Sequence, residues 1–217
     1  MVLALAVVFD LSFIELYRKL GSAAFDIEVE NAYPEYYENL KEFFIAGMAV
    51  WLFIRKREVL YGCWAGLLTY LFVDDTFQLH ERIGAFLGSL IWFHPPFGLR
   101  TNDVGELIVS AVVGTCFLVA LTLNFKQGTR ESKAVSLGLL GLLISLAAFG
   151  VVVDMVHIVI QSEAWKYRLG LIEDGGEMLV VSSMLAFVLW RLLAGRGRLT
   201  QTLNWQRPQI AALEEAA

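Results

Sequence analysis

Two histidines and several acidic residues stand in the sequence at spacings that suit metal binding. Asp154 precedes His157 by three positions, which is the spacing of the Glu-x-x-His element of di-iron and di-manganese carboxylate proteins. Oxygen-rich ligands combined with imidazole suit Zn, Mn or Fe. The sequence therefore predicts a mono- or dinuclear site for a divalent metal. The candidate ligands are Asp74, His80, Glu81, Glu106, Asp154, His157 and Glu177.

These candidates are expected at a common depth near one end of a helical bundle. Counted at about 1.5 Å per residue from the basic end of each apolar run, the acids and histidines lie roughly 20–36 Å away. Carboxylates gathered in the outer third of a bilayer need compensation by a cation, by protons or by nearby arginines. His80 fits this arrangement only if the helix bends, since a straight helix points it about 120° away from Asp74.

A short repeat relates two of the acidic segments. Residues 103–109 read Asp-Val-Gly-Glu-Leu-Ile-Val, and residues 174–180 read Asp-Gly-Gly-Glu-Met-Leu-Val. Each copy follows an apolar run whose end carries Asp and His. This pattern predicts duplicated helical hairpins, at about 59–125 and 134–193, related by an axis along the membrane normal.

The repeated Asp-x-x-Glu pattern also has a purely structural interpretation. Asp103 and Asp174 could be the N-caps of two helices, with Glu106 and Glu177 completing capping boxes. Capping does not account for Asp154, which is expected inside a helix, near the end where the dipole is negative.

The elements that must position these residues are apolar runs long enough to cross a bilayer. Of 217 residues, 57% are hydrophobic and 18% are charged, whereas soluble domains have about 45–50% and about 25%. The runs approach or exceed the roughly 20 residues that span the hydrocarbon core. They cover 43–54 (extended by the helical-looking 35–42), 59–73, 104–125, 134–160, 169–193 and, with interruptions, 1–17. The predicted fold is all-α: a polytopic membrane helical bundle with five to six transmembrane helices.

Basic residues indicate the orientation of this bundle. Loops 55–57 and 126–133 and the segment 191–207 are rich in Arg and Lys, and they fall on one side if the spans alternate. That side is expected to be cytoplasmic, which places both termini inside. We expect a single bundle domain over 1–198 and a polar cytoplasmic tail over 199–217, in the inner membrane of a bacterium.

Composition excludes several classes of function. The net charge of −5 argues against a nucleic-acid partner, and two cysteines cannot form a disulfide framework. The apolar runs contain no lysine at mid-depth that could hold retinal. Membrane lipids and other membrane protein subunits are the expected partners.

Three functions remain open at this level. The first is a metal-dependent hydrolase or oxidase that acts on a lipid-like or small substrate. The second is a non-catalytic accessory subunit of a larger membrane complex. The third is proton-coupled transport, which also requires polar residues in the cytoplasmic half of the bundle, where the sequence has few.

Overall fold

The described part of the chain is helical, which confirms the all-α prediction. This computed structural model describes residues 1–29, 31–160 and 163–214, except for the side chains of 97, 158, 163–164, 166–167 and 195–214. The helices are α1 (Val2–Leu20), α2 (Tyr33–Lys56), α3 (Val59–Phe77), α4 (Leu79–Ser89), α5 (Thr101–Phe125), α6 (Arg130–Ala147), a π-helix (Ala148–Val153), α7 (Asp154–Val159) and α8 (Glu163–Glu214). Two 3-10 turns, Ala23–Phe25 and Pro96–Gly98, lie in the connections.

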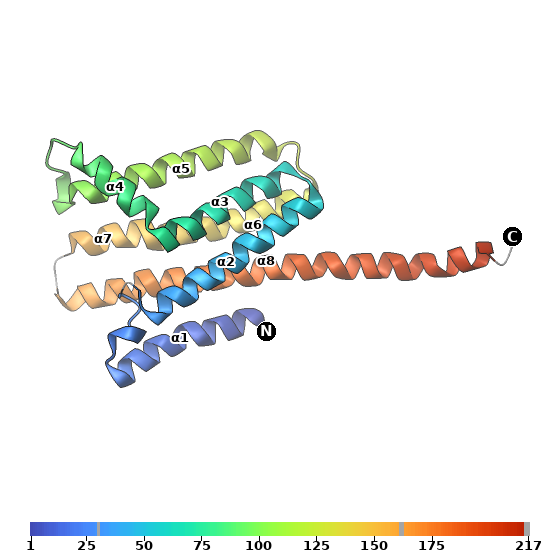
Figure 1. The fold of residues 1–217 in the computed structure, drawn as a ribbon, viewed down its shortest axis with the longest axis horizontal. Helices are drawn as coiled ribbons and strands as arrows, with labels where there is room; N and C mark the ends of the chain where they lie inside the picture. Colours follow the sequence, from blue (N-terminus) through green and yellow to red (C-terminus); the bar gives the residue numbers. More distant parts are fainter. Residues whose placement is uncertain (30, 161–162, 215–217) are drawn as a thin grey trace.

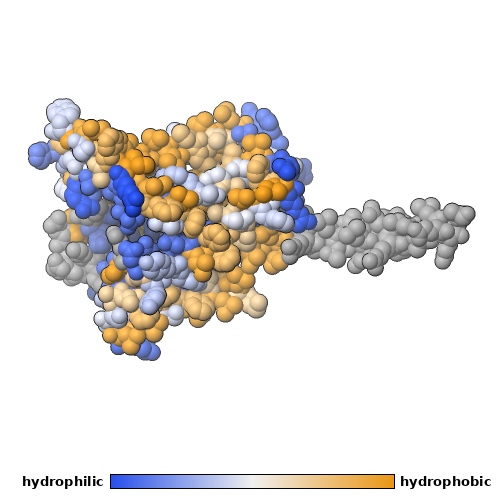
Figure 2. Space-filling view, viewed as in Figure 1, coloured by the Kyte–Doolittle hydropathy of each residue, from blue (hydrophilic) through white to orange (hydrophobic). Residues whose placement is uncertain are grey.

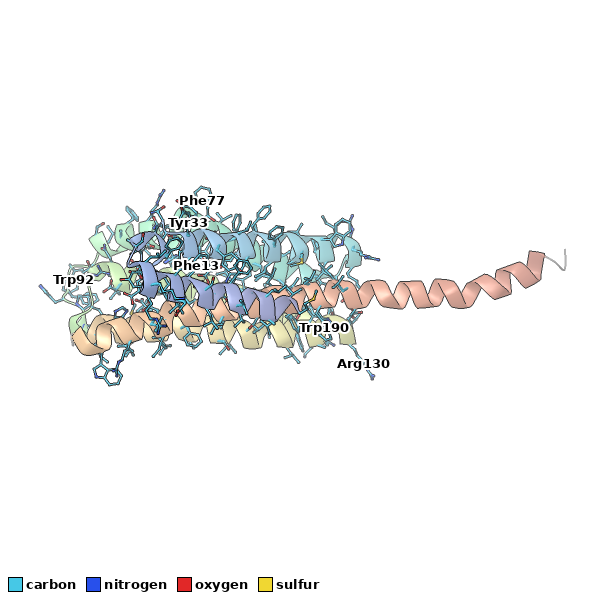
Figure 3. The ribbon with its side chains drawn as sticks, turned by 90° about the horizontal axis from the view of Figure 1, so that it is seen from below. Phe13, Tyr33, Phe77, Trp92, Arg130 and Trp190 are labelled. Atoms are coloured by element: carbon cyan, nitrogen blue, oxygen red, sulfur yellow. The ribbon has the colours of Figure 1, made fainter. Side chains whose placement is uncertain are left out.

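The long helices pack side by side and alternate in direction (Figure 1). The α2–α3 and α5–α6 turns lie at the end where α8 leaves the bundle, opposite the α4–α5 and α7–α8 connections (Figure 1). The three basic segments therefore share one end, called the basic end below, and the opposite end is called the acidic end. Trp92 lies at the acidic end, whereas Trp190 and Arg130 lie at the basic end (Figure 3).

Among the described residues, three helical segments are long and apolar enough to cross a membrane. They are Thr101–Phe125, Arg130–His157 and Arg168–Ala194. Helices α2 and α3 have 24 and 19 residues, but α2 has four charged residues in its first ten and α3 has two aspartates in its last turn. Five to six spans therefore remain a prediction. Hydrophilic side chains gather near the two ends of the bundle, with apolar side chains between them (Figure 2).

The half of the bundle near the basic end is filled by a hydrophobic core. Trp64 is 1% exposed and packs edge-on against Phe117, with ring centroids 4.8 Å apart. The indole of Trp64 donates a hydrogen bond to Ser136 Oγ at 3.0 Å, so its buried N–H is satisfied. Leu60, Leu121, Val135, Leu139 and Val188 complete this region.

Hydrogen bonds tie the two turns at the basic end together. Thr129 caps α6 by accepting a bond from the Ser132 backbone N–H at 3.2 Å, and its hydroxyl donates to Glu58 Oε2 at 3.1 Å. Partial burial raises the pKa of Glu58, but hydrogen bonds from Ser132 and Thr129 outweigh it and hold the pKa below the ordinary 4.5.

Two helices are interrupted near the acidic end. Gln78 adopts a left-handed conformation, with φ of 51°, so that α3 ends and α4 begins at the same residue. The left-handed region is uncommon for residues other than glycine and often marks a functional site. Helix α6 passes into α7 through the π-helix, another feature that is frequent at functional sites.

The internal repeat is not confirmed by these elements. Asp103 is the third residue of α5, which begins at Thr101, whereas Asp174 lies inside α8, which begins at Glu163. The capping interpretation is therefore wrong for Asp174 and Glu177, because an interior helical position has no free backbone N–H to cap. In α5 the N-cap residue is Arg100 and Asp103 is the third helical residue, so the predicted capping roles of Asp103 and Glu106 are wrong as well. The Asp103 carboxylate accepts hydrogen bonds from the Arg100 backbone N–H at 2.7 Å and from Arg100 Nε at 2.9 Å.

Candidate metal centre

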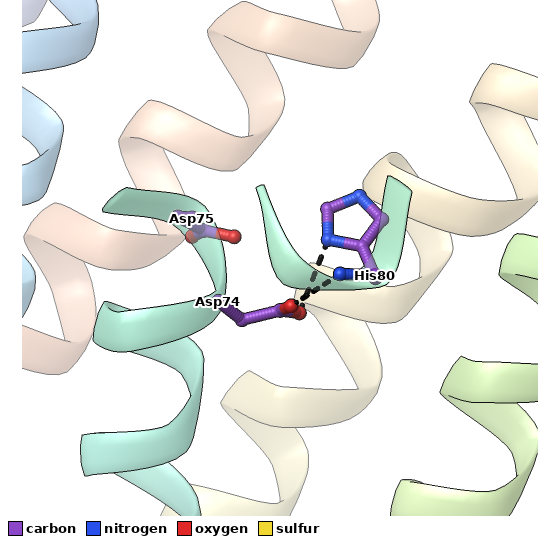
Figure 4. Close-up of side chains that lie close together, drawn as sticks. All are labelled: Asp74, Asp75 and His80. Atoms are coloured by element: carbon purple, nitrogen blue, oxygen red, sulfur yellow. Dashed lines mark hydrogen bonds and ion pairs between the residues drawn. The ribbon is translucent and has the colours of Figure 1, made fainter. Parts of the chain in front are cut away.

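The interruption of the helix at Gln78 places the His80 side chain beside the Asp74 carboxylate (Figure 4). Asp74 Oδ1 accepts a hydrogen bond from the His80 backbone N–H at 2.7 Å, and Oδ2 lies 3.1 Å from His80 Nδ1. The bend that the sequence required for His80 to join Asp74 is thus present.

Asp74, Asp75 and His80 form a compact group of possible metal ligands. Each offers one ligand atom, and these atoms all lie within 4.8 Å of one another. Two ligands that each lie about 2.0–2.2 Å from a zinc ion are at most about 4.4 Å apart, so small side-chain movements suffice to close the group on a cation. Asp74 is buried, His80 is half-buried and Asp75 is exposed, which gives an ion a route from the surface.

Asp74 also affects the protonation of the His80 ring. The hydrogen bond to Asp74 raises the pKa of His80 above its ordinary 6.5, although burial acts in the opposite direction. His80 and Asp74 could ligate one ion together only through His80 Nδ1, with the ion in place of the proton between Nδ1 and Asp74 Oδ2. An ion on Nε2 would lie on the far side of the ring, and Asp74 would then be an outer partner of the histidine and not a ligand.

Two further candidates, Glu81 and Glu106, lie close enough to His80 for their charges to interact with it. Charges on both His80 and Glu81 act on the Glu106 carboxyl group. Helices α4 and α5 approach closely here, since a Cβ added at Gly84 would overlap the backbone and side chain of Glu106. The absence of a side chain at Gly84 therefore sets the position of Glu106.

Asp154 and His157 have a common partner in Glu173 of α8. His157 Nδ1 lies 2.7 Å from Glu173 Oε2, and the Asp154 side chain also hydrogen-bonds with Glu173. The Asp-x-x-His pair is therefore assembled across α7 and α8, away from the Asp74–His80 pair. Both histidines have Nδ1 beside a carboxylate oxygen, although their partners come from different helices.

Glu177 of α8 lies beside the π-helix, where its Oε1 occupies the space that a side chain at Gly150 would take. The charges that act on it come from Glu38, Asp75 and Asp174, among others. Glu42 shares a side-chain hydrogen bond with Asp75. Asp75 is therefore the link between the Asp74–His80 pair and α2.

The structure thus divides the predicted ligands among three neighbourhoods. Asp74 and His80 are in direct contact, Asp154 and His157 meet at Glu173, and Glu177 lies beside Gly150 of the π-helix. Among the described residues, no group of three ligand atoms within 4.8 Å includes Glu81, Glu106, Asp154, His157 or Glu177. Asp75 and Glu173 were not among the ligands predicted from the sequence. Folding brings them next to residues of other helices, which the spacing of residues along the chain does not indicate.

A buried ion pair near these acids was also not predicted. Lys41 and Asp10 are 2% and 3% exposed, and Lys41 Nζ lies 2.9 Å from Asp10 Oδ1. Lys41 also donates to the Met178 carbonyl and Ser182 Oγ, both at 3.1 Å, and Ser182 donates to Asp10 Oδ2 at 2.6 Å. Lys41 lies just before the apolar run 43–54, among acids that could have paired with it on the same helix. The available signal was Asp10, an acid inside the apolar run 1–17, which needs a positive partner from another helix.

Comparison with known proteins identifies a family but no activity. A family model described as a domain of unknown function (DUF8692) matches residues 1–192. No curated protein and no solved structure matches the chain. The matched range includes all the acids and histidines discussed above.

Proposed function

The chain therefore belongs to this family of domains of unknown function, and we propose that it is an integral membrane protein that binds a divalent metal ion through Asp74, Asp75 and His80. The observation that carries the proposal is the grouping of two carboxylates and an imidazole with ligand atoms within 4.8 Å. Asp74 also caps the first turn of α4 by accepting the His80 backbone N–H, but that role needs neither Asp75 nor the His80 ring.

Three protein ligands leave at least one coordination position open. Catalytic zinc sites have this arrangement, in which the fourth position holds water or substrate. A metal bound here would act as a Lewis acid or lower the pKa of a bound water, and Mn or Fe would also be compatible with the donors. The proposed activity is metal-dependent hydrolysis or oxidation of a lipid-like or small substrate that reaches the acidic end.

The distribution of buried polar groups favours this function over proton-coupled transport. The ionisable side chains described above gather toward the acidic end, whereas the core near the basic end consists of hydrophobic side chains such as Leu60, Leu139 and Val188. A proton path across the bilayer needs polar groups or water through both halves. The accessory-subunit alternative would use the same acids as a metal-free hydrogen-bonded network.

Elemental analysis of the purified protein tests the proposal. We expect about one or more tightly bound divalent ions per chain, as mononuclear and dinuclear sites require. His80→Ala and Asp74→Asn should each lose most of the metal at this group, because removing a ligand leaves an incomplete coordination shell. His94→Ala is the matched control, since His94 is an exposed loop histidine, and it should keep the wild-type metal content.

The result that would overturn the proposal is equally direct. A wild-type protein with only trace metal, after exchange against Zn²⁺, Mn²⁺ and Fe²⁺ under anaerobic conditions, would show that the group does not bind metal. The accessory-subunit function would then be the better account.

A further inference from the structure

We infer that helix α4 lies in the lipid head-group layer at the acidic end, and that the Asp74–Asp75–His80 group therefore acts on a lipid of that leaflet. An exposed apolar stripe along α4, called the α4 stripe below, is the surface that contacts the lipid. It consists of Leu79, Ile83, Phe86 and Leu90. The inference rests on the proposed function and narrows its substrate class to membrane lipids.

Glycines hold α4 close against the beginning of α5. A Cβ added at Gly105 would overlap the Gly84 carbonyl group, and one added at Gly88 would overlap the Thr101 carbonyl group. The residue numbers rise along α4 while those of the neighbouring residues fall along α5, so the two helices run antiparallel over this turn. They lie side by side at the acidic end (Figure 1). The depth of each α4 residue therefore follows from the α5 residue beside it.

This register places α4 at the edge of the hydrocarbon core. Helix α5 is one of the three described segments long and apolar enough to span, and it ends at Phe125, directly before Lys126. A hydrocarbon core of about 30 Å takes up about 20 residues, so its boundary at the acidic end falls at about residue 106. The head-group layer beyond it is about 5–7 Å thick, which is about four residues more. Because Gly84 lies beside Gly105, and Gly88 beside Thr101, this turn of α4 lies in the head-group layer.

Helix α4 has one apolar and one polar exposed face at this depth. Ile83, Phe86 and Leu90 are 45%, 65% and 64% exposed. Together with Leu79 they fall within a sector of about 60°, since successive residues are about 100° apart around a helix. The exposed residues of a second sector of similar width are Arg82, Ala85 and Ser89. This division is typical of helices that lie at a membrane surface, with the apolar face toward the acyl chains and the polar face toward water.

Aromatic residues that follow α4 mark the same layer. Trp92 and Phe93 are 92% and 49% exposed, and Trp92 lies at the acidic end (Figure 3). Trp is enriched at membrane–water interfaces because its ring is apolar and its N–H is polar. A lipid leaflet covers these aromatic side chains and the α4 stripe together, and it leaves the polar face of α4 in water.

The depth of α4 determines the depth of the proposed metal ligands. His80 precedes Gly84 by one helical turn, so it lies about 6 Å deeper, just inside the boundary where ester groups join lipid head groups to acyl chains. Asp75 is exposed, and Phe77, two residues later, is 54% exposed, so the group opens beside an apolar surface. A lipid already presents its polar groups at this depth, whereas a water-soluble substrate would have to cross the head-group layer.

The accessibility of nitroxide spin labels tests the position of α4. Labels are attached to single cysteines in full-length protein that carries Cys63→Ala and Cys116→Ala, reconstituted into vesicles of phosphatidylcholine and phosphatidylglycerol. Labels on the α4 stripe (Ile83→Cys, Phe86→Cys, Leu90→Cys) should be relaxed mainly by oxygen, which concentrates among acyl chains. Labels on the other exposed face (Arg82→Cys, Ala85→Cys, Ser89→Cys) should be relaxed mainly by a water-soluble nickel chelate. Val119→Cys on the exposed side of α5 is the lipid control, and Arg130→Cys in the turn before α6 is the water control.

Mn²⁺ bound to the protein tests the link between the lipid and the proposed site. The vesicles then contain phosphatidylcholine with a nitroxide either near the head group or near the end of an acyl chain. Mn²⁺ on the wild-type protein should broaden the signal of the label near the head group more than that of the label near the chain end. His80→Ala should lose this difference at the same Mn²⁺ concentration, which controls for Mn²⁺ held by the head groups themselves.

The outcomes separate this inference from the proposed function. Equal relaxation of both α4 faces by the nickel chelate would show that α4 does not contact lipid, and the metal site would be unaffected. Bound Mn²⁺ that broadens neither lipid label, or broadens the label near the chain end more strongly, would refute the lipid substrate alone. A protein that takes up no Mn²⁺, Zn²⁺ or Fe²⁺ would refute the proposed function and the lipid substrate with it, while the spin labels on α4 would still decide its contact with lipid.

Discussion

The buried pair of Lys41 and Asp10 offers the sharpest test of how the bundle is held together. It joins α1 to α2, and Ser182 extends the network to α8 through bonds to both members of the pair. Lys41 also lies 4.8 Å from the centroid of the Tyr37 ring. Asp10→Asn would keep the side-chain shape but leave the ammonium buried without its counter-charge.

The expected loss of stability follows from the partners that remain. Removing one member of a buried ion pair typically costs about 3–5 kcal/mol. Asp10→Asn should lower the stability by about 3 kcal/mol, since Ser182 and the Met178 carbonyl still accept hydrogen bonds from Lys41. Lys41→Met should lower the stability by about 5 kcal/mol, because Asp10 would keep only the hydrogen bond from Ser182. For a chain of this size, about 3 kcal/mol corresponds to a melting temperature lower by roughly 6–12 °C.

The assay is a double-mutant cycle on the purified protein in one detergent. Unfolding is followed by circular dichroism against temperature and against denaturing detergent for the wild type, Asp10→Asn, Lys41→Met and the double variant. The double variant should be more stable than either single variant, since it leaves no unpaired buried charge. Glu15→Gln is the control, because Glu15 pairs with Arg18 and Lys19 on the exposed face of α1, where solvent screens such pairs.

Two results would refute this reasoning. Single variants as stable as the wild type would mean that α1 does not dock on α2 and α8 through this pair. A double variant whose loss equals the sum of the two single losses would mean that Lys41 and Asp10 do not interact.

Three other predictions concern the π-helix, the basic end and the topology. Gly150→Ala should cost about 1 kcal/mol, the low end of overpacking, because the added Cβ meets only the movable carboxylate end of Glu177. Gly141→Ala, where a Cβ meets nothing within 4 Å, should be neutral or slightly stabilising; equal thermal shifts would contradict this. Because the pKa of Glu58 is held below 4.5, the ionised Glu58 side chain stabilises the folded protein above about pH 4.5. This stabilisation is lost as the pH falls through the lowered pKa. Glu58→Gln should therefore flatten the acid limb of the stability profile by at most about 1 kcal/mol, and an unchanged limb would count against the Glu58 bonds. A cysteine at position 130 should be labelled only from the cytoplasmic side, and labelling from outside would reverse the orientation.

The sequence alone determined the class of fold and the end of the bundle where most of the buried acids lie. Apolar runs separated by charged turns allow little except helices in a membrane, because each helix satisfies its own backbone hydrogen bonds. Three of those runs fall in helical segments long and apolar enough to span. Counting residues along each run also put the acids near one end, since the rise per residue of a helix is fixed.

Only the tertiary structure decided which of these acids meet. The contact of His80 with Asp74 depends on a left-handed Gln78, a conformation that no local pattern signals in a residue other than glycine. Glu173 becomes the partner of His157, and Asp75 that of Glu42, through packing between helices. Lys41 pairs with Asp10, although the two residues are 31 positions apart in the sequence. Spacing along one helix fixes which side chains share a face, but the neighbour opposite that face is set by how the helices pack.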